Sequence, residues 1–361
     1  MMVVIHHAQS EAAVLAGRAG VAGAYPWQGA GLPWPAGVDI FFVVSGFVIV
    51  HAARGLYGVP GGARRFLAHR VARLVPLYWL VSAVYLAIAL AVPGVLSGDG
   101  MRPGPGYVVA SFLFWPAVRP DGAAVPLYGL GWTLQYEMLF YALFAVGLGW
   151  GRRFAVAWIA GTLGLLLAAS VAIPSLPMPL AFWANPIVLE FAFGAGLSLA
   201  RAEGLRLSRA LRLGLAILGL GLLASAGPPD ATTRPWLWGV PALCLVAAAV
   251  LGADRRAREG RLVRAAERLG AASYALYLVH PFALRLVREV IVRGGLAPAA
   301  ATPAGTGAGL ALMIGAAVLA ALAVEGYVER PLTRWARRRL DPGASAGDGA
   351  VLRLPAGREG R

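Results

Sequence analysis

The stretch GWTLQYEMLFYALF, residues 131–144, is mostly apolar and aromatic and contains a single carboxylate, Glu137. The apolar run continues to about Trp150, so it approaches the ~20 residues that a helix needs to span a bilayer. An ionisable group at the centre of such a helix costs at least ~2.5–3.5 kcal/mol on insertion scales. The stretch therefore predicts a membrane-embedded helix whose acidic residue serves either a functional site or a polar packing contact.

The remainder of the 361-residue chain has the same apolar character. It is 59% hydrophobic and 14% charged, with a mean hydropathy of +0.68, whereas soluble domains carry roughly 25% charged residues. This composition predicts an all-α, polytopic membrane protein rather than a soluble protein with one large core. The net charge of +15 comes from arginines that cluster in loops between apolar runs, which favours membrane topology over nucleic-acid binding. With Cys244 as the only cysteine, we expect no cysteine-based metal site, and we predict no bound metal.

Ten apolar stretches are candidate membrane-spanning helices. A further apolar piece, residues 107–118, is short for a span. If it does not cross, the large arginine clusters all fall on one side, the cytoplasm, and both termini are cytoplasmic. We therefore predict about ten transmembrane helices with 107–118 re-entrant or interfacial, and Arg285, Arg288 and Arg293 are exceptions to the charge rule. The candidate spans are 1–17, 37–53, 71–92, 131–149, 154–173, 183–200, 210–226, 236–252, 272–293 and 307–328.

The two ends of the chain differ from the rest. Only five apolar residues precede His6, so the first helix is expected to be short on its cytoplasmic side, as if its start were missing. Residues 341–361 are rich in Gly, Pro, Arg and Asp and are expected to form a disordered cytoplasmic tail. We thus predict one transmembrane domain over residues 1–340.

Polar residues within the candidate spans mark sites by default. His7 and Glu11 are four residues apart on a helix, so the carboxylate can hold the imidazole as a general base, or the pair can simply lie near the helix end. Thr133, Glu137 and Tyr141 form one stripe at the same spacing, which Trp132 flanks.

Other polar positions allow structural and functional interpretations alike. Asp39 lies at the start of a helix, where a carboxylate caps backbone N–H groups and meets the positive end of the dipole. Ser45 precedes a glycine in mid-span, where a close helix approach or a local break is possible. Glu190 lies mid-span without an explanation from packing rules. Tyr277 and His280 share a face before Pro281, which either opens backbone to a cavity or kinks the helix.

Arg70 and Arg73 lie three residues apart just before the third candidate span. Two guanidiniums on one helix face suit a phosphate or a pyrophosphate. Anchoring at the cytoplasmic surface is the alternative interpretation.

Six segments together resemble the membrane acyltransferase-3 family. The resemblance runs from residue 2 to about 335, and the segments occur in the family's order. They are GVDIFFVVSGFVI (37–49), FLAHRVARLVPLYW (66–79), GWTLQYEMLFY (131–141), LEFAFGAG (189–196), SYALYLVHP (273–281) and VERPLTRW (328–335).

This resemblance implies a multi-pass enzyme of the bacterial cytoplasmic (inner) membrane. Members transfer an acyl group, often acetyl, from cytoplasmic acyl-CoA to a hydroxyl of an extracytoplasmic or lipid-linked glycan, as in lipopolysaccharide or exopolysaccharide. The expected partners are thus acyl-CoA as donor substrate, a glycan acceptor and membrane lipids, with no permanently bound cofactor. The family's first-helix histidine aligns with His7, and its functional positions map onto Arg70, Arg73 and Glu137.

The implied roles are His7 as general base or transient acyl carrier, Glu137 as the group that orients an imidazole or the acceptor, and Arg70 with Arg73 as ligands of the CoA phosphates. One departure is that the family usually has an arginine about eleven residues before the histidine, and here that position would precede Met1. A proton-coupled transporter and an inactive relative with a truncated start therefore stay as alternatives.

Overall fold

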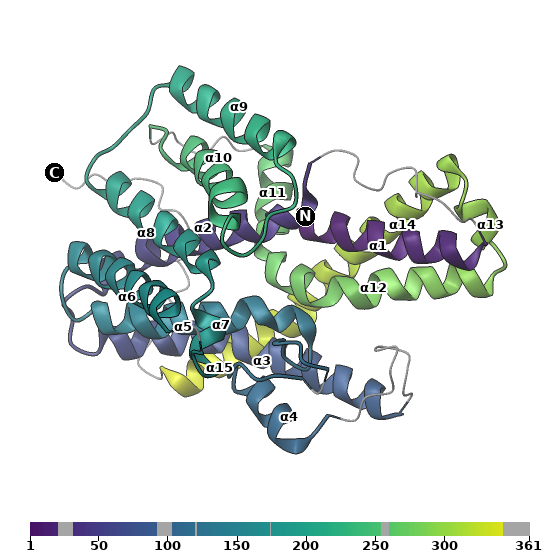
Figure 1. Ribbon diagram of the computed structural model, residues 1–361, viewed down its shortest axis with the longest axis horizontal. Coiled ribbons are helices and arrows are strands. Elements are labelled where there is room, and N and C mark those ends of the chain that lie inside the picture. Colours follow the sequence, from purple (N-terminus) through teal and green to yellow (C-terminus); the bar gives the residue numbers. More distant parts are fainter. Residues whose placement is uncertain (21–31, 92–102, 120, 174, 254–259, 342–361) are drawn as a thin grey trace. The chain divides into compact units, whose positions relative to one another are not determined.

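The computed structural model describes residues 1–20, 32–91, 103–119, 121–173, 175–253 and 260–341, and within these ranges it contains helices and no strand (Figure 1). The predicted all-α class is confirmed. The chain divides into two compact units. Unit 1 comprises Met1–Val38, Leu223–Pro228 and Arg258–Pro331, and unit 2 comprises Asp39–Leu222, Pro229–Ala257 and Leu332–Arg361.

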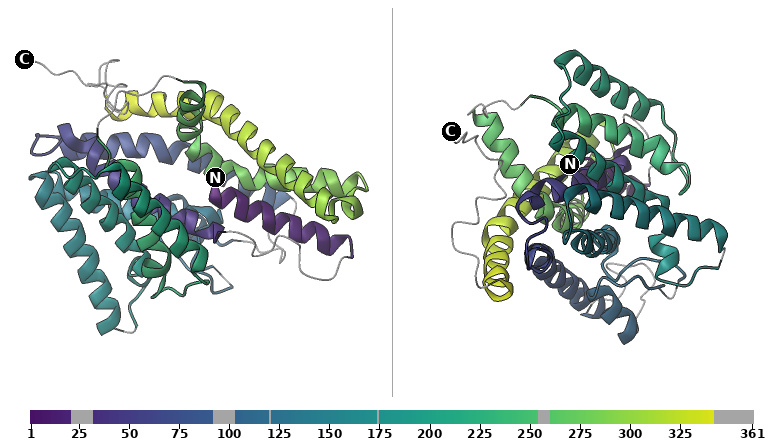
Figure 2. Two further views of the ribbon diagram at one scale, coloured as in Figure 1. Left: turned by 90° about the horizontal axis from the view of Figure 1, so that it is seen from above. Right: turned by 90° about the vertical axis from the view of Figure 1, so that its left-hand side faces the viewer.

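Unit 1 is built on three long helices that pack against one another, α1, α12 and α14, as both Figure 1 and Figure 2 show. Their contact faces carry buried alanines, including Ala8, Ala283 and Ala317, which let helix backbones approach closely. The elements of the unit are α1 (Met2–Arg18), η1 (Trp34–Ala36), α11 (Arg261–Ala271), α12 (Ser273–Arg293), α13 (Ala297–Ala300), α14 (Pro303–Val324) and the π-helical turn η6 (Glu325–Glu329).

Unit 2 holds the remaining helices. The range predicted as one span at 183–200 is divided, because α7 ends at Trp183 and α8 begins at Leu189. The elements are α2 (Gly37–Ala52), η2 (Ala53–Gly55), α3 (Gly62–Ala91), α4 (Pro105–Phe112), η3 (Gly129–Gly131), α5 (Trp132–Gly147), α6 (Arg152–Ala172), α7 (Leu180–Trp183), η4 (Pro186–Val188), α8 (Leu189–Ala202), α9 (Arg209–Ser225), η5 (Pro235–Gly239), α10 (Val240–Val250) and α15 (Arg330–Leu340).

Two glycines bring α2 and α8 into backbone contact. A Cβ on Gly46 would lie 2.2 Å from the carbonyl oxygen of Phe191, and one on Gly194 would lie 1.9 Å from that of Val43. The ring of Phe42 stacks on Phe191 at 4.4 Å beside this crossing. Of the two possibilities at Ser45-Gly46, the structure therefore has the close approach in an unbroken helix.

Among the described residues, four helices are long and apolar enough to cross a membrane by length and composition, and a shorter apolar helix covers Pro235–Val250. Helix α4 has eight residues, far too few to cross the ~30 Å core, in agreement with a re-entrant or interfacial segment. The count of about ten spans and the cytoplasmic termini stay predictions. The four helices are Trp34–Gly55, Gly62–Ala91, Arg152–Ala172 and Pro303–Leu340.

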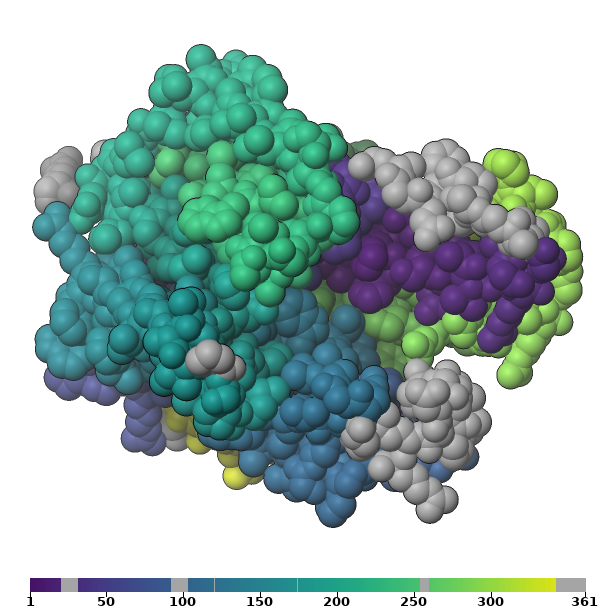
Figure 3. Space-filling model, viewed as in Figure 1, coloured from purple at the N-terminus to yellow at the C-terminus, as the bar shows by residue number. Residues whose placement is uncertain are grey.

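Apolar side chains are exposed along several helices. Val171 on α6 is 85% exposed, and α9, which forms the surface at the top of Figure 3, exposes Leu213 and Ile217. Contiguous apolar surface of this kind is unfavourable in water and suits contact with lipid. The predicted disordered tail, residues 341–361, lies outside the described residues except for Asp341.

Candidate active site

Glu137 on α5 is buried, and hydroxyl groups satisfy its carboxylate. Its Oε1 accepts hydrogen bonds from Tyr141 Oη, one turn along the same helix, and from Ser45 Oγ on α2, each at 2.7 Å. Thr133, predicted to lie on the same stripe, donates its hydroxyl hydrogen bond to the carbonyl oxygen of Leu130 at 3.3 Å. The helix therefore places Glu137 and Tyr141 together as predicted, while Ser45 reaches the carboxylate through the α2 contact.

Arg70 on α3 extends this polar group. The side chain is buried, lies beside Tyr141 and close to Glu137 and Arg73, and its guanidinium lies 5.6 Å above the Phe66 ring. Its Nε has no hydrogen-bond partner among the described residues. Unit 2 thus brings together two groups that the sequence predicted separately, the carboxylate of α5 and the arginine pair of α3.

Aromatic rings surround the start of α5. Trp132 packs against Phe42 at 6.1 Å and against Tyr136 at 5.9 Å, while Tyr136 stacks on Phe182 and donates a hydrogen bond of 2.6 Å to its carbonyl oxygen. Trp132 therefore belongs to an aromatic wall at the beginning of the helix. Such a wall keeps water away from the carboxylate one to two turns further along.

Asp39 lies in the first turn of α2, as expected for a residue that meets the helix dipole, but its side chain has another partner. Arg234 donates from Nε and Nη2 to the two carboxylate oxygens, each at 2.9 Å, and its guanidinium lies 5.1 Å above the ring of Trp238. Asp39 is fully buried. Sequence analysis missed Arg234, and the signal for it was an arginine directly before an apolar helix in TTRPW, residues 232–236.

Glu190 lies next to this ion pair. It is fully buried in the first turn of α8, beside Asp39 and Arg234, and neither of its carboxyl oxygens has a hydrogen-bond partner among the described residues. A Cβ on Gly239 would come within 3.0 Å of its Oε1, so α8 packs tightly on η5 here. Glu190, predicted to lie mid-span, is thus at the start of a helix, and its neighbours are a second carboxyl and the arginine that they share.

In unit 1 the imidazole of His7 has another imidazole as its neighbour. The ring of His280 lies 5.2 Å from that of His7, and the ring of Tyr277 lies 6.4 Å from that of His280. His280 Nδ1 is 2.9 Å from the carbonyl oxygen of Leu276. Because a carbonyl only accepts, Nδ1 carries the proton, and the Nε2 of a neutral ring is then an acceptor. That Nε2 is buried and has no hydrogen-bond partner among the described residues.

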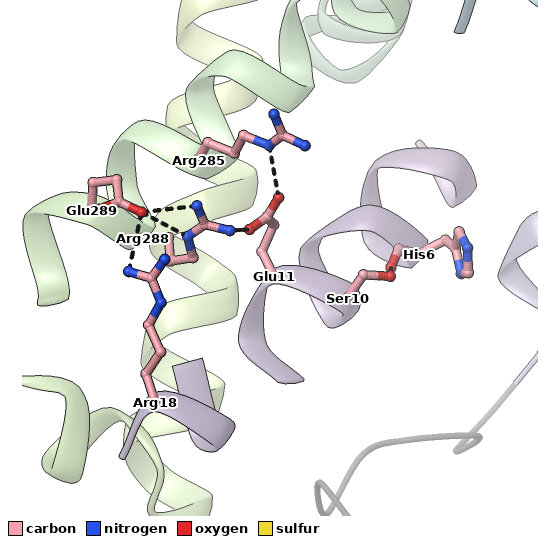
Figure 4. Close-up of polar contacts among 7 residues, drawn as sticks. All are labelled: His6, Ser10, Glu11, Arg18, Arg285, Arg288 and Glu289. Carbon is pink, nitrogen blue, oxygen red and sulfur yellow. Dashed lines mark hydrogen bonds and ion pairs between the residues drawn. The ribbon is translucent and has the colours of Figure 1, made fainter. Parts of the chain in front are cut away.

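The carboxylate of Glu11, predicted to hold His7, forms ion pairs with arginines of α12 instead (Figure 4). Arg288 contacts its Oε2, and Arg285 lies 3.4 Å from its Oε1. Arg288 also bonds Glu289 at 2.8 Å. Arg285 and Arg288, two of the predicted exceptions to the charge rule, thus have carboxylate partners within unit 1. The hydroxyl of Ser10 bonds the backbone oxygen of His6 at 3.1 Å.

His7 belongs to unit 1, whereas Glu137 and the arginine pair belong to unit 2. Within unit 2, Glu137, Tyr141, Ser45 and Arg70 form a continuous polar group. Their joint action with His7 stays a prediction.

Comparison with known proteins gives one family and several relatives. Residues 1–322 match the family described as "Acyltransferase domain". The chain is 32% identical over 328 residues to "Exopolysaccharide production protein ExoZ" of Rhizobium meliloti (strain 1021), covering 87% of this chain and 94% of that protein. It is 28% identical over 349 residues to "Acyltransferase MdmB" of Streptomyces mycarofaciens, covering 88% and 85%. No solved structure gives a significant match.

Proposed function

Because the chain belongs to the membrane acyltransferase-3 family and is thus an integral membrane acyltransferase, we propose that it moves an acyl group, acetyl in the simplest case, from acyl-CoA to a glycan hydroxyl. The relative from Rhizobium meliloti is named for exopolysaccharide production, which supports a polysaccharide or its lipid-linked precursor as acceptor. The cytoplasmic origin of the donor and the extracytoplasmic side of the acceptor are parts of the same proposal.

The observation that carries this proposal is the polar group of unit 2. The buried carboxylate of Glu137 bonds two hydroxyls, those of Ser45 and Tyr141, and the guanidinium of Arg70 lies beside Tyr141. The guanidinium of Arg70 can bind the phosphates of a CoA thioester, and the carboxylate of Glu137 with its two hydroxyl neighbours can bind the hydroxyls of a sugar. Such an arrangement is expensive in a membrane protein unless a polar substrate uses it.

In the proposed reaction His7 is the general base. The acceptor oxygen forms an ester bond to the acyl carbon, and the carbon–sulfur bond of the thioester breaks. The hydroxyl proton passes to the imidazole and then to the departing CoA thiolate, so the products are the acylated glycan and free CoA. Glu137 positions the acceptor or an imidazole, and Arg70 and Arg73 hold the phosphates.

The test measures CoA release and acyl transfer by the purified protein in lipid nanodiscs, with acetyl-CoA and a glycan fraction of the host. We expect His7→Ala to lower turnover about 100-fold or more, because general acid–base catalysis contributes roughly 10²–10⁴. His6→Ala is the matched control, since it removes the neighbouring imidazole from the same helix. Unchanged turnover in His7→Ala would reject the base.

Two other outcomes decide the wider proposal. A parent protein that neither binds nor consumes acyl-CoA, but moves a solute with protons across a vesicle membrane, would replace the donor assignment with transport. Mass spectrometry of surface glycans from cells with and without the gene tests the acceptor. Identical acylation in both would reject a glycan substrate in that host.

A further inference from the structure

The last described helix brings a third arginine to the pair on α3. Arg337 of α15 lies near Arg70 and Arg73, close enough for direct electrostatic repulsion between the guanidiniums. All three belong to unit 2, and α15 runs beside α3 in Figures 1 and 2. Neither sequence position nor motif spacing connects them, since Arg337 follows Arg73 by more than 260 residues.

A carboxylate at the end of α15 holds this helix against α3. Asp341 Oδ2 lies 3.0 Å from His69 Nε2 and 3.3 Å from Arg65 Nε, and both partners precede Arg70 on α3. Residues four apart share a helix face, so the same side of α15 that carries Asp341 also carries Arg337 one turn earlier. The position of Arg337 is therefore fixed by a contact independent of any substrate.

The positive charge of this group is not neutralised within the fold. The Nε atoms of Arg70 and Arg337 are buried without a hydrogen-bond partner, and none of the three arginines forms a direct ion pair with a carboxylate of the described residues. Glu137 is the one carboxylate that acts on Arg70 there. The three guanidiniums repel one another, and the buried Arg70 among them has this carboxylate as its acidic neighbour.

We propose that Arg70, Arg73 and Arg337 form a single three-guanidinium site for the pyrophosphate group of a substrate, with Arg337 as a ligand supplied by α15. A pyrophosphate diester carries two negative charges, which offset the excess of positive charge, and its oxygens accept the forked hydrogen bonds that guanidiniums donate. This proposal rests on the proposed function, because the acyl-CoA donor contains that group and a lipid-linked acceptor can contain it too. CoA has a pyrophosphate between pantetheine and ribose, and lipid-linked sugars are commonly attached through one.

The test compares Arg337→Gln with Arg338→Gln, which removes an exposed arginine from the next position of the same helix. Binding to protein in nanodiscs is measured by calorimetry for CoA, for dephospho-CoA, for pantetheine, and for a short-chain prenyl pyrophosphate sugar. We expect Arg337→Gln to weaken every pyrophosphate ligand that the parent binds by about tenfold or more, and Arg338→Gln by less than about twofold. Pantetheine, which has no phosphate, is expected to bind all forms equally.

Arg337→Lys is a control for misfolding, because lysine keeps the positive charge but lacks the planar guanidinium that donates two parallel hydrogen bonds. We expect intermediate affinity from this variant and an unfolding midpoint equal to that of the parent. The CoA and prenyl arms identify the source of the pyrophosphate, and a dependence on Arg337 in either supports the site.

Failure of the site and failure of the proposed function give different results. A parent that binds CoA while Arg337→Gln binds it as tightly as Arg338→Gln overturns the role of Arg337 and leaves the acyltransferase proposal intact. A loss for CoA without a loss for dephospho-CoA assigns Arg337 to the 3′-phosphate and overturns the pyrophosphate assignment. A parent that binds no CoA refutes the proposed donor, and the prenyl arm then decides whether the site exists.

Discussion

Arg234 and Arg70 are both largely buried within the described part of unit 2, but only Arg234 has a direct carboxylate partner there. Arg234 makes a forked ion pair with Asp39 and lies over the face of Trp238. Arg70 has a hydroxyl and a more distant carboxylate on one side and two further guanidiniums on the other. Within the fold, Asp39 compensates the charge of Arg234. We expect the charge of Arg70 to be compensated by an anionic ligand.

The contrast separates arginines that support the fold from arginines that bind substrate. Removing one partner from a buried ion pair leaves an uncompensated charge. A substitution in the pair of Arg234 and Asp39, called the closed pair below, should therefore lower the free energy of unfolding. Removing one of several neighbouring cations relieves repulsion between them. A substitution among Arg70, Arg73 and Arg337, called the open group below, should therefore weaken ligand binding and leave the free energy of unfolding nearly unchanged. Substitution of Arg234 should therefore be detected by thermal unfolding, and substitution of Arg70 by a ligand-binding assay.

The largest expected effect is on the closed pair. Arg234→Gln leaves the Asp39 carboxylate buried without its counter-ion, and we expect it to lower the free energy of unfolding by about 3–5 kcal/mol. Thermal unfolding in detergent measures the loss. The double variant with Asp39→Asn should recover part of it, because the orphaned charge is gone. A stability equal to the parent in Arg234→Gln would show that the pair contributes nothing to the fold.

The second effect is at the open group. Arg70→Gln should weaken CoA binding by about 1.5–3 kcal/mol, roughly ten- to 100-fold, because hydrogen bonds to charged groups have that magnitude. Its unfolding midpoint should stay near that of the parent, in contrast to Arg234→Gln. Calorimetry and thermal unfolding of the same preparations check both halves. Equal destabilisation by the two variants would remove the distinction between them.

A third, smaller effect concerns Glu190, which lies beside the ion pair of Arg234 and Asp39 and has no hydrogen-bond partner in the described part of the chain. Glu190→Gln removes a carboxyl from a site where two carboxyls share one arginine, and its amide can donate to Asp39. We expect the free energy of unfolding to change by less than about 1 kcal/mol, and in the stabilising direction. A loss comparable to that of Arg234→Gln would mean that Glu190 is an equal member of the ion pair.

The sequence predicted the features that depend on spacing along one helix. The apolar runs gave the all-α class, and the four-residue spacing correctly placed Tyr141 beside Glu137. The three-residue spacing of Arg70 and Arg73 likewise stands within one helix, α3. These relations need only the geometry of a single helix, which is the same wherever the helix packs.

Contacts between side chains of different helices could not be predicted from spacing along the sequence. Arg234 pairs with Asp39 from 195 residues away, and Ser45 on α2 reaches Glu137 on α5 from 92 residues away. Glu11 shows the converse error, since a suitable neighbour existed at His7 but arginines of α12 bind its carboxylate instead. Local spacing gives the candidates for a contact, and tertiary packing selects among them.

The smallest effect is expected at an exposed ion pair of unit 2, Arg119 with Asp121. The hydrogen bond from the Arg119 guanidinium lowers the pKa of the Asp121 carboxyl to about 2. The stabilisation is therefore present above the pKa of the unfolded carboxyl, near ~3.9, and is lost as the pH falls through about 2. Arg119→Gln should return that pKa toward the usual value, which carboxyl NMR titration measures, and lower stability at pH 7 only slightly, because solvent screens the pair. A marked loss of stability at pH 7 would contradict this and would show that exposure is not what separates this pair from the buried one at Asp39.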